Sequence, residues 1–319
     1  MKHKLFSVLL CVVASILLVG AGVEEDAVAA SFEEGHVQIQ MAAGSVQRGN
    51  PDLPDQAVYA AAGISLMDLV DQLDPSVRID GEYAPADICK VQEDGTTYVA
   101  LAAMAAALDS EIQVNWDQNS ETVTITTSQL KLTAKVGQLY LEANGRYLYI
   151  PERIQLVDGK VTVPLWAVTK AFDAKLSWDD ASDTVLITRG SGALQSGDTF
   201  YNHESLFWLS RVIHAESGNQ PLEGKMAVGN VIMNRVESPI FPNTVQGVLA
   251  QKNQFSTYKK GALANRTPNA GSVIAAKLVL DGGEVEETEN ALYFDSCSTS
   301  WAARNKTYVA TIGGHKFYR

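Results

Sequence analysis

The sequence predicts an α+β fold class, in which two small α+β repeats precede a C-terminal region that begins with two helices. Two observations lead to this prediction. Matching residues recur 64 positions apart between about residues 77 and 188, which indicates a duplicated supersecondary unit. From Leu206 onward, apolar residues recur instead at three- and four-residue spacing, which is typical of the buried face of a helix.

In each repeat the pattern predicts a strand, a glycine turn, a second strand, a short helix and a closing hairpin. The helices are expected over residues 101–108 and 165–172. Trp116 and Trp178 begin the two hairpin turns at matching positions, so we expect both to be core residues that the fold requires, with platforms for sugar rings as the alternative. The residues that carry the repeat are Gly81, Tyr83, Gly95, Val99 and Leu101, which recur as Gly145, Tyr147, Gly159, Val163 and Leu165.

Two neighbouring helices are predicted at the start of the C-terminal region. The first has its apolar stripe over residues 206–213 and ends at residues 217–219. The second begins at Pro221, whose missing N–H is not needed in the first turn of a helix. Glu216 therefore lies at the rim of a helix end. A carboxylate half sheltered by apolar groups keeps its proton to higher pH, which a general acid that cleaves a glycosidic bond requires.

The N-terminal residues have the features of a secretory signal peptide, so a secreted, extracellular protein is expected. A positive start at residues 1–4 precedes an apolar run over residues 5–19, and Ala27-Val28-Ala29 offers a cleavage site. An uncleaved N-terminal anchor is the alternative. The predicted organisation is a signal peptide (1–29), a flexible tether (30–56), tandem repeats (57–190, divided into 57–127 and 128–190), a linker (191–199) and a C-terminal domain (200–319).

Charge is unevenly distributed along the chain. From Thr199 onward there are 12 Lys or Arg against 10 Asp or Glu, whereas the whole chain carries a net charge of −12. A nearly neutral C-terminal domain can approach an anionic polymer without strong repulsion. Because the chain has no basic stripe, nucleic acid is not an expected partner. Since no second hydrophobic stretch exists, no membrane contact is expected after signal cleavage.

Neither a metal nor a cofactor is expected. The sequence lacks H-E-x-x-H, and its C-terminal histidines show no zinc-ligand spacing. The segment from His214 to Glu216 matches the H-x-E of zinc deaminases, but the required P-C-x-x-C is missing. No G-x-S-x-G elbow supports a serine nucleophile. Cys89 and Cys297 fall in different predicted domains, so no disulfide between them is expected.

Five separated motifs, in order, resemble the SleB family of cell wall hydrolases. They are Val212-Ile213-His214-Ala215-Glu216 with Gly224 to Arg235, Phe241-Pro242-Asn243-Thr244-Val245, Gln254-Phe255-Ser256, Ala291-Leu292-Tyr293-Phe294, and Ile312-Gly313-Gly314-His315-Lys316-Phe317-Tyr318. The resemblance covers about 115 of the 319 residues. It implies a lysozyme-like, mainly helical domain that cuts the glycan strands of peptidoglycan, with Glu216 as the catalytic glutamate. The loop after Glu216 departs from the family pattern at Ser217, Gly218, Asn219 and Gln220.

The resemblance further implies a lytic transglycosylase that cleaves cell wall or spore cortex between N-acetylmuramic acid and N-acetylglucosamine. Glu216 would act first as acid and then as base. A muramidase-type hydrolase is the alternative, and it would need a second carboxylate, for which Asp295 and the acidic residues 284–289 are the candidates. A non-catalytic wall-binding or spore-coat protein is a further alternative.

Four residues are expected to form the walls of a sugar-binding cleft. Gln254 and Ser256 can hydrogen-bond to sugar hydroxyl or N-acetyl groups. The ring faces of Tyr293 and Trp301 can stack on pyranose rings.

The tandem repeats resemble the small α+β domain named from the N-terminus of copper amine oxidase. The segments from Gly159 to Leu165 and from Lys175 to Asp179 carry this resemblance, and Ala100 stands where the first repeat would have proline. Residues 30–199 contain one histidine, His36, which is insufficient for a multi-histidine copper site. We therefore expect a binding or spacing module that contacts the wall or an accessory protein, with an unrecognised enzyme domain as the alternative.

Overall fold

The computed structural model of the chain describes residues 26–33, 36–43, 76–88, 91–93, 95–252, 254–259 and 261–319. Most of the predicted signal peptide, the first part of the predicted first repeat and Cys89 lie outside the described residues. Within the described part of the chain, the helices are too short or too polar to cross a membrane.

The N-terminal described residues form an antiparallel hairpin of β1 (Asp26–Glu33) and β2 (His36–Ala43). Asp26 pairs with Ala43, and Glu33 pairs with His36. This hairpin differs from the flexible tether predicted to begin at residue 30. Apolar and polar residues alternate from Val37 to Met41, which is the period of a strand, but the Gly, Ala and Ser content of the segment masks this alternation.

The repeats contribute strands to three sheets. Their strands are β3 (Ser76–Ile79), β4 (Glu82–Tyr83), β5 (Val91–Glu93), β6 (Thr96–Ala100), β7 (Gln113–Asp117), β8 (Thr122–Thr126), β9 (Lys131–Lys135), β10 (Tyr140–Ala143), β11 (Arg146–Tyr149), β12 (Gln155–Val157), β13 (Lys160–Pro164), β14 (Lys175–Asp179) and β15 (Thr184–Thr188). A five-stranded sheet has the order β11-β10-β9-β8-β7, and two four-stranded sheets have the orders β12-β13-β6-β5 and β14-β15-β3-β4. Each sheet therefore combines strands from both repeats.

The pairing of β6 with β13 shows how the two repeats are related. Val99 pairs with Val163, its equivalent 64 positions later in the sequence. The helices that follow these strands, α4 (Leu101–Leu108) and α5 (Leu165–Ala171), also occupy equivalent positions. The segments predicted as separate repeats, 57–127 and 128–190, thus share their sheets and do not each close a sheet of their own.

The expectation that the two hairpin tryptophans belong to the core is wrong. Trp116 is 42% exposed and Trp178 is 44% exposed. Both lie on edge strands, β7 and β14, of their respective sheets. An edge strand has a neighbouring strand on one side only, so its side chains are covered less than those of a central strand.

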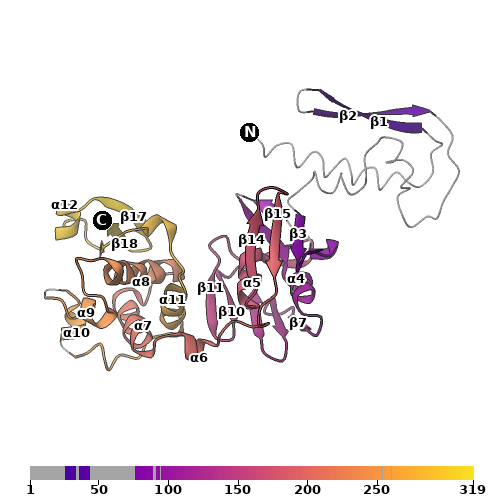
Figure 1. Cartoon of the computed structure of the whole chain (residues 1–319). Coiled ribbons are helices and arrows are strands. Elements are labelled where there is room, and N and C mark those ends of the chain that lie inside the picture. The colour runs from indigo at the N-terminus through magenta and orange to yellow at the C-terminus, as the bar shows by residue number, and fades with distance from the viewer. Residues whose placement is uncertain are drawn as a thin grey trace. The chain divides into compact units, whose positions relative to one another are not determined.

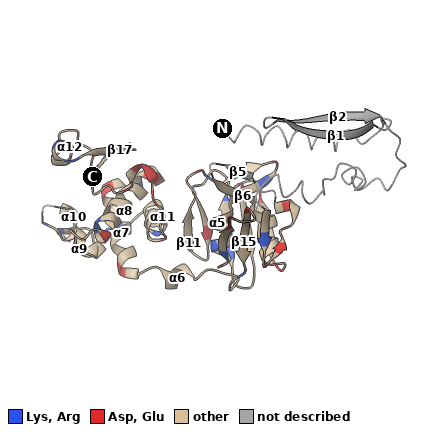
Figure 2. Ribbon diagram, turned by 45° about the horizontal axis from the view of Figure 1, so that its top comes forward, with Lys and Arg blue, Asp and Glu red and all other residues tan. Residues whose placement is uncertain are grey.

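The C-terminal region is mainly helical, as predicted, and Figure 1 shows its helices grouped around α7, α8 and α11. Its elements are α6 (Gly197–Phe200), α7 (His203–Ser217), α8 (Leu222–Glu237), α9 (Val245–Leu249), α10 (Ser256–Lys259), α11 (Ala270–Leu280), the 3-10 helix η2 (Glu286–Thr288), β16 (Tyr293–Asp295), α12 (Trp301–Asn305), β17 (Tyr308–Ile312) and β18 (His315–Tyr318). Helices α7, α8 and α11 contact one another, and Figure 2 shows the few charged residues that their ribbons carry. Ile213, Met226 and Ala276 are fully buried in the core between them. The three last strands form a sheet of order β16-β18-β17.

Residues 191–199 do not form the free linker that was predicted. Leu194 is buried, and its N–H donates to the carbonyl of Ala171 at 3.0 Å. The N–H of Gly197 donates to the carbonyl of Asn144 at 2.9 Å. Residues 78–177 and 186–319 accordingly form one compact unit, and the remaining described residues form a second.

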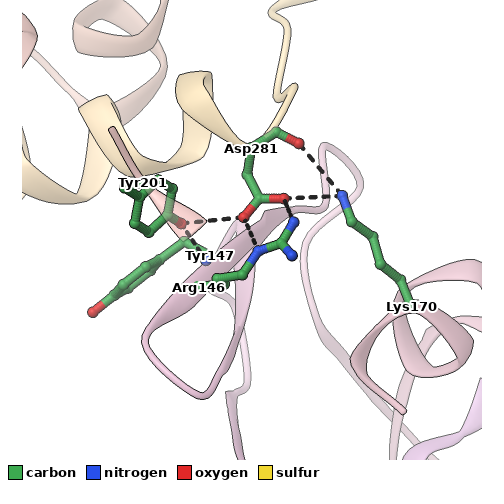
Figure 3. Close-up of polar contacts among 5 residues, drawn as sticks. All are labelled: Arg146, Tyr147, Lys170, Tyr201 and Asp281. Atoms are coloured by element: carbon green, nitrogen blue, oxygen red, sulfur yellow. Dashed lines mark hydrogen bonds and ion pairs between the residues drawn. The ribbon is translucent and has the colours of Figure 1, made fainter. Parts of the chain in front are cut away.

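A buried polar cluster ties the end of α11 to the repeats (Figure 3). Asp281 accepts hydrogen bonds from the Nε and Nη2 of Arg146 at 2.8 and 2.6 Å, and it lies 3.0 Å from the Nζ of Lys170. The hydroxyl of Tyr201 donates to Asp281 at 3.1 Å and accepts the N–H of Tyr147. Burial alone would raise the pKa of Asp281, but the hydrogen bonds from Arg146 and Lys170 outweigh it and lower this pKa. Three tyrosines of β10 and β11 also pack against the helical core.

Candidate active site

Glu216 is the last residue but one of α7, and the helix end predicted from the sequence is confirmed. The helix stops where the N–H of Gly218 donates to the carbonyl of His214 at 3.1 Å. A Cβ at Gly218 would lie 2.5 Å from that carbonyl oxygen, so this position has no room for a side chain. The close packing of the backbone therefore requires a glycine two residues after the acid.

The end of α7 is fastened to the start of α11 by one side chain. The Nδ2 of Asn269 donates to the carbonyl of Gly218 at 3.0 Å. The Oδ1 of Asn269 accepts the N–H of Ser272 at 2.9 Å and so caps α11. Its own N–H donates to the Nδ1 of His214 at 3.4 Å. The residues on both sides of Glu216 are thus held by the first turn of α11.

The environment of Glu216 suits a proton donor. The side chain is half-buried beside the helical core, and this burial raises the pKa of its carboxyl group. The positive charge of the exposed Arg266 acts in the opposite direction, but its effect is the smaller one. A raised pKa keeps a larger fraction of the carboxyl groups protonated near neutral pH, where a general acid is needed.

Glu216 faces a cleft of about 500 Å³ that is open to solvent. Gln254 and Ser256, both predicted as cleft walls, line it together with the acid. Four further residues, which the sequence did not identify as cleft walls, also line it: Arg235, Phe255, Lys259 and Phe294. Phe255 has a positive φ of 37°, a backbone conformation that non-glycine residues seldom adopt.

Arg235 is a buried cation in this wall, with 3% of its surface exposed. Its Nε donates to the carbonyl of Leu292 at 2.7 Å, and its Nη1 donates to the Oε1 of Gln254 at 3.2 Å. Burial lowers the pKa of Arg235 to about 10, so the guanidinium stays charged at neutral pH. Arg235 falls seven residues after the buried Val228 of α8, and this place on the apolar stripe is the signal that could have identified it as an inward-facing residue.

The predicted aromatic wall residues, Tyr293 and Trp301, do not line this cleft. Their ring centroids lie 5.8 Å apart, and the Nζ of Lys306 is 4.6 Å from the ring centroid of Tyr293. Tyr293 and Phe294 are successive residues of β16, so their side chains project from opposite faces of the strand. It is Phe294 that lines the cleft, while the ring of Tyr293 lies 5.4 Å from the guanidinium of Arg235.

Of the described residues that line the cleft, Glu216 is the one carboxylate. The acidic residues 284–289 and Asp295, the candidates for a second carboxylate, are not among the lining residues. The Oδ1 of Asp295 accepts the N–H of Cys297 at 2.7 Å. Within the described part of the chain, no group of three or more His, Cys, Asp or Glu side chains is arranged to hold a metal ion.

Comparison with known protein families confirms both resemblances seen in the motifs. Residues 219–318 match the family described as Cell Wall Hydrolase, and residues 78–187 match the Copper amine oxidase N-terminal domain. The C-terminal part of the chain is therefore a cell wall hydrolase domain. Glu216 lies three residues before the matched segment. The second match spans both sequence repeats, in agreement with the shared sheets.

Characterised relatives match the same part of the chain. A spore cortex-lytic enzyme of Bacillus cereus (strain ATCC 14579) is 34% identical over 121 residues, which are 37% of this chain and 45% of the relative. A spore cortex-lytic enzyme of Bacillus subtilis (strain 168) is 28% identical over 120 residues, 37% of this chain and 38% of the relative. The match thus spans less than half the length of either relative. The solved catalytic domain of the germination-specific lytic transglycosylase SleB from Bacillus anthracis is 30% identical, covers 40% of this chain and all of its own, and gives a TM-score of 0.34.

Proposed function

We propose that this cell wall hydrolase domain cleaves peptidoglycan glycan strands as a lytic transglycosylase, between N-acetylmuramic acid and N-acetylglucosamine. The observation that carries the proposal is the half-buried Glu216, the one carboxylate among the described lining residues of its cleft. Burial favours its protonated form. Similarity to the two spore cortex-lytic enzymes supports peptidoglycan as the substrate.

The chemistry requires one group that changes from acid to base. Glu216 donates its proton to the bridging oxygen as the bond from that oxygen to C1 of the muramoyl sugar breaks. The resulting carboxylate then accepts the proton of the C6 hydroxyl of the same sugar, while O6 forms a new bond to C1. The products are a strand with a free hydroxyl and a 1,6-anhydromuramoyl end, and no water is consumed. Because the nucleophile belongs to the substrate, its attack is intramolecular and needs no second carboxylate.

The cleft wall can orient the sugars for this reaction. Arg235 holds the Oε1 of Gln254, which leaves the amide N–H₂ of Gln254 to donate to a sugar hydroxyl or an acetamide oxygen. Ser256 offers a hydroxyl from the first turn of α10. We assign Tyr293 and Trp301 to a contact with a sugar beyond the cleft. Their rings lie 5.8 Å apart, and the Tyr293 ring is 5.4 Å from the guanidinium of Arg235, which itself holds Gln254 of the cleft wall.

The proposed site of action is outside the cell, at the vegetative wall or the spore cortex. The apolar N-terminal run over residues 5–19 and the cleavage site near residue 29 support export. The near-neutral charge from residue 199 onward is compatible with approach to anionic wall polymers.

Digestion of purified peptidoglycan in heavy-oxygen water tests the reaction type. A transglycosylase leaves unlabelled 1,6-anhydro ends, which mass spectrometry shows to be one water lighter than hydrolysis products. A muramidase-type hydrolase places the label at the new sugar end, and such labelling would disprove the one-glutamate mechanism. Absence of any new sugar ends with a folded protein would instead favour a non-catalytic wall-binding role. The Glu216→Gln variant should lower turnover by at least about a hundredfold while the protein stays folded.

A further inference from the structure

The first repeat presents an apolar shelf on the edge strand β7. Trp116 pairs across the sheet with Val123, and Val114 pairs with Ile125. Directly paired residues of neighbouring strands lie on the same face. Val123 and Ile125 are buried, whereas Val114 is 49% exposed and Trp116 is 42% exposed. The shelf formed by Val114 and Trp116 therefore lies at the uncovered margin of an otherwise buried face.

The second repeat has the same feature on its own edge strand, β14. Leu176 and Trp178 are separated by one residue, as Val114 and Trp116 are, and both are exposed. A tryptophan needed only for a core is expected to be buried. Each repeat instead leaves more than two fifths of the surface of a tryptophan residue in solvent, at the matching position of its closing hairpin.

Charge around the first shelf restricts what can bind there. Residues 111–121 include Glu111, Asp117 and Glu121 but no Lys or Arg. The side chain of Asp117 is fixed by the N–H of Asn119 at 2.9 Å and the hydroxyl of Ser120 at 2.7 Å, and these bonds hold its pKa below the usual value. Asp117 follows Trp116 directly in β7, so its side chain projects from the opposite face of the strand. On β7 the shelf face therefore carries no charged side chain that would select an anionic polymer, nucleic acid or an acidic lipid headgroup.

An uncharged sugar ring matches both properties. The C–H face of a pyranose stacks on an indole, and its hydroxyl and acetamide groups hydrogen-bond to polar neighbours. The second hairpin has the same polar turn, since Asp179 accepts the N–H of Ala181 at 3.2 Å and the hydroxyl of Ser182 at 2.5 Å.

We propose that Trp116 and Trp178 are each a stacking platform for an uncharged, N-acetylated sugar ring of a glycan strand. The choice of glycan as ligand rests on the proposed function of the C-terminal domain. Trp116 belongs to the same compact unit as the cleft. A long strand that is bound at this platform therefore presents its cleavable bonds to Glu216 at a raised effective concentration. A short oligomer that fills only the cleft gains nothing from either platform.

Binding by the full chain carrying Glu216→Gln tests the platforms without cleavage. The probes are purified peptidoglycan freed of anionic polymers and a soluble hexamer of N-acetylglucosamine. Trp116→Leu and Trp178→Leu, which keep an apolar side chain but lose the ring, should each weaken binding to peptidoglycan by about two- to tenfold. Trp116→Phe and Trp178→Phe should retain most of the affinity. Leu156→Ala is the matched control, because Leu156 is also an exposed apolar residue on an edge strand, β12.

Three results would overturn the platforms. One is unchanged peptidoglycan binding in the double Leu variant, and another is an equal loss in the Phe and Leu variants. The third is that the wild type forms an oligomer, that the Leu substitutions dissociate this oligomer, and that glycan binding does not change. The shelves would then join copies of the chain. Cleavage by the chain with Glu216 intact separates this proposal from the proposed function. If the chain binds glycan but does not cleave it, the proposed function alone is wrong. If the wild type and the double Leu variant cleave long strands at equal rates, and also cleave short strands at equal rates, the platforms alone are wrong.

Discussion

Substitution of Asp281 by Asn should destabilise the protein strongly, because it leaves the Arg146 cation buried without its counter-charge. The side chains of Asp281 and Arg146 are only 2% and 10% exposed. Breaking a buried pair from one side costs about 3–5 kcal/mol. We expect the low end, about 3 kcal/mol, because Asn still accepts one hydrogen bond and Arg146 also stacks on the ring of Phe200 at 3.4 Å. For a unit of this size, that loss lowers Tm by roughly 6–12 °C.

Calorimetric unfolding of the full chain measures this effect, with Arg153→Gln as the control. Arg153 pairs with Glu223 at 3.5 Å, but both side chains are exposed, so the control should lose about 1 kcal/mol or less. The double variant Arg146→Met/Asp281→Leu should recover part of the loss, because apolar residues replace a buried pair well, while Tyr201 and Lys170 still lose their acceptor. Equal Tm changes for Asp281→Asn and Arg153→Gln would refute the reasoning.

The same cluster predicts how stability depends on pH. The pKa of Asp281 is lower in the folded protein than the ordinary value of 3.8. Its stabilising contribution is therefore fully present above the unfolded pKa and is lost as pH falls through the folded pKa. The wild type should lose more stability on acidification below about pH 4 than Asp281→Asn does, and parallel acid curves for the two proteins would contradict this.

Three further predictions concern the acid and the domain organisation. Arg266→Gln removes a positive charge that lowers the pKa of Glu216. The pKa of Glu216 should therefore rise further, and the alkaline limb of the pH–rate profile should move to higher pH. An unmoved limb would show that the two charges do not interact during catalysis. Gly218→Ala should lower kcat at least about tenfold, since a Cβ would lie 2.5 Å from the carbonyl oxygen of His214, and steady-state kinetics at a temperature where the variant is folded will show whether it does. A truncated chain beginning at Ser196 should unfold at lower temperature than the full chain, because it exposes the core surface that tyrosines of β10 and β11 cover; an unchanged Tm would mean that this contact contributes little.

Local patterns predicted the features closest to the chemistry. The spacing of apolar residues located α7 and α8, and the break at residues 217–219 placed Glu216 at a helix end. The motif Gln254-Phe255-Ser256 placed two residues of the cleft wall, and Phe255 between them lines the wall as well. Each of these features depends on residues within a few positions of one another, where periodicity is informative.

Features that depend on contacts between distant residues were not predictable in the same way. The repeats share sheets because β6 pairs with β13 across 64 positions, and no local pattern distinguishes this from two separate sheets. Strand register decided which of Tyr293 and Phe294 lines the cleft, since a shift of one residue exchanges the two faces of a strand. The exposure of Trp116 likewise follows from the position of β7 at the edge of its sheet, which the order of strands in the sequence does not specify.

Helix α11 connects the acid to the repeats. At its start, Asn269 holds the Gly218 carbonyl just after Glu216, and at its end, Asp281 is held by Arg146. The helix has 11 residues and so spans about 16 Å, with most of its inward face buried against α7 and α8. A helix packed in this way transmits a displacement of one end to the other as a rigid element. The repeats therefore form part of the support of the active site as well as a separate surface for glycan, and variants that loosen the Arg146–Asp281 contact should lower kcat even at temperatures where the protein remains folded.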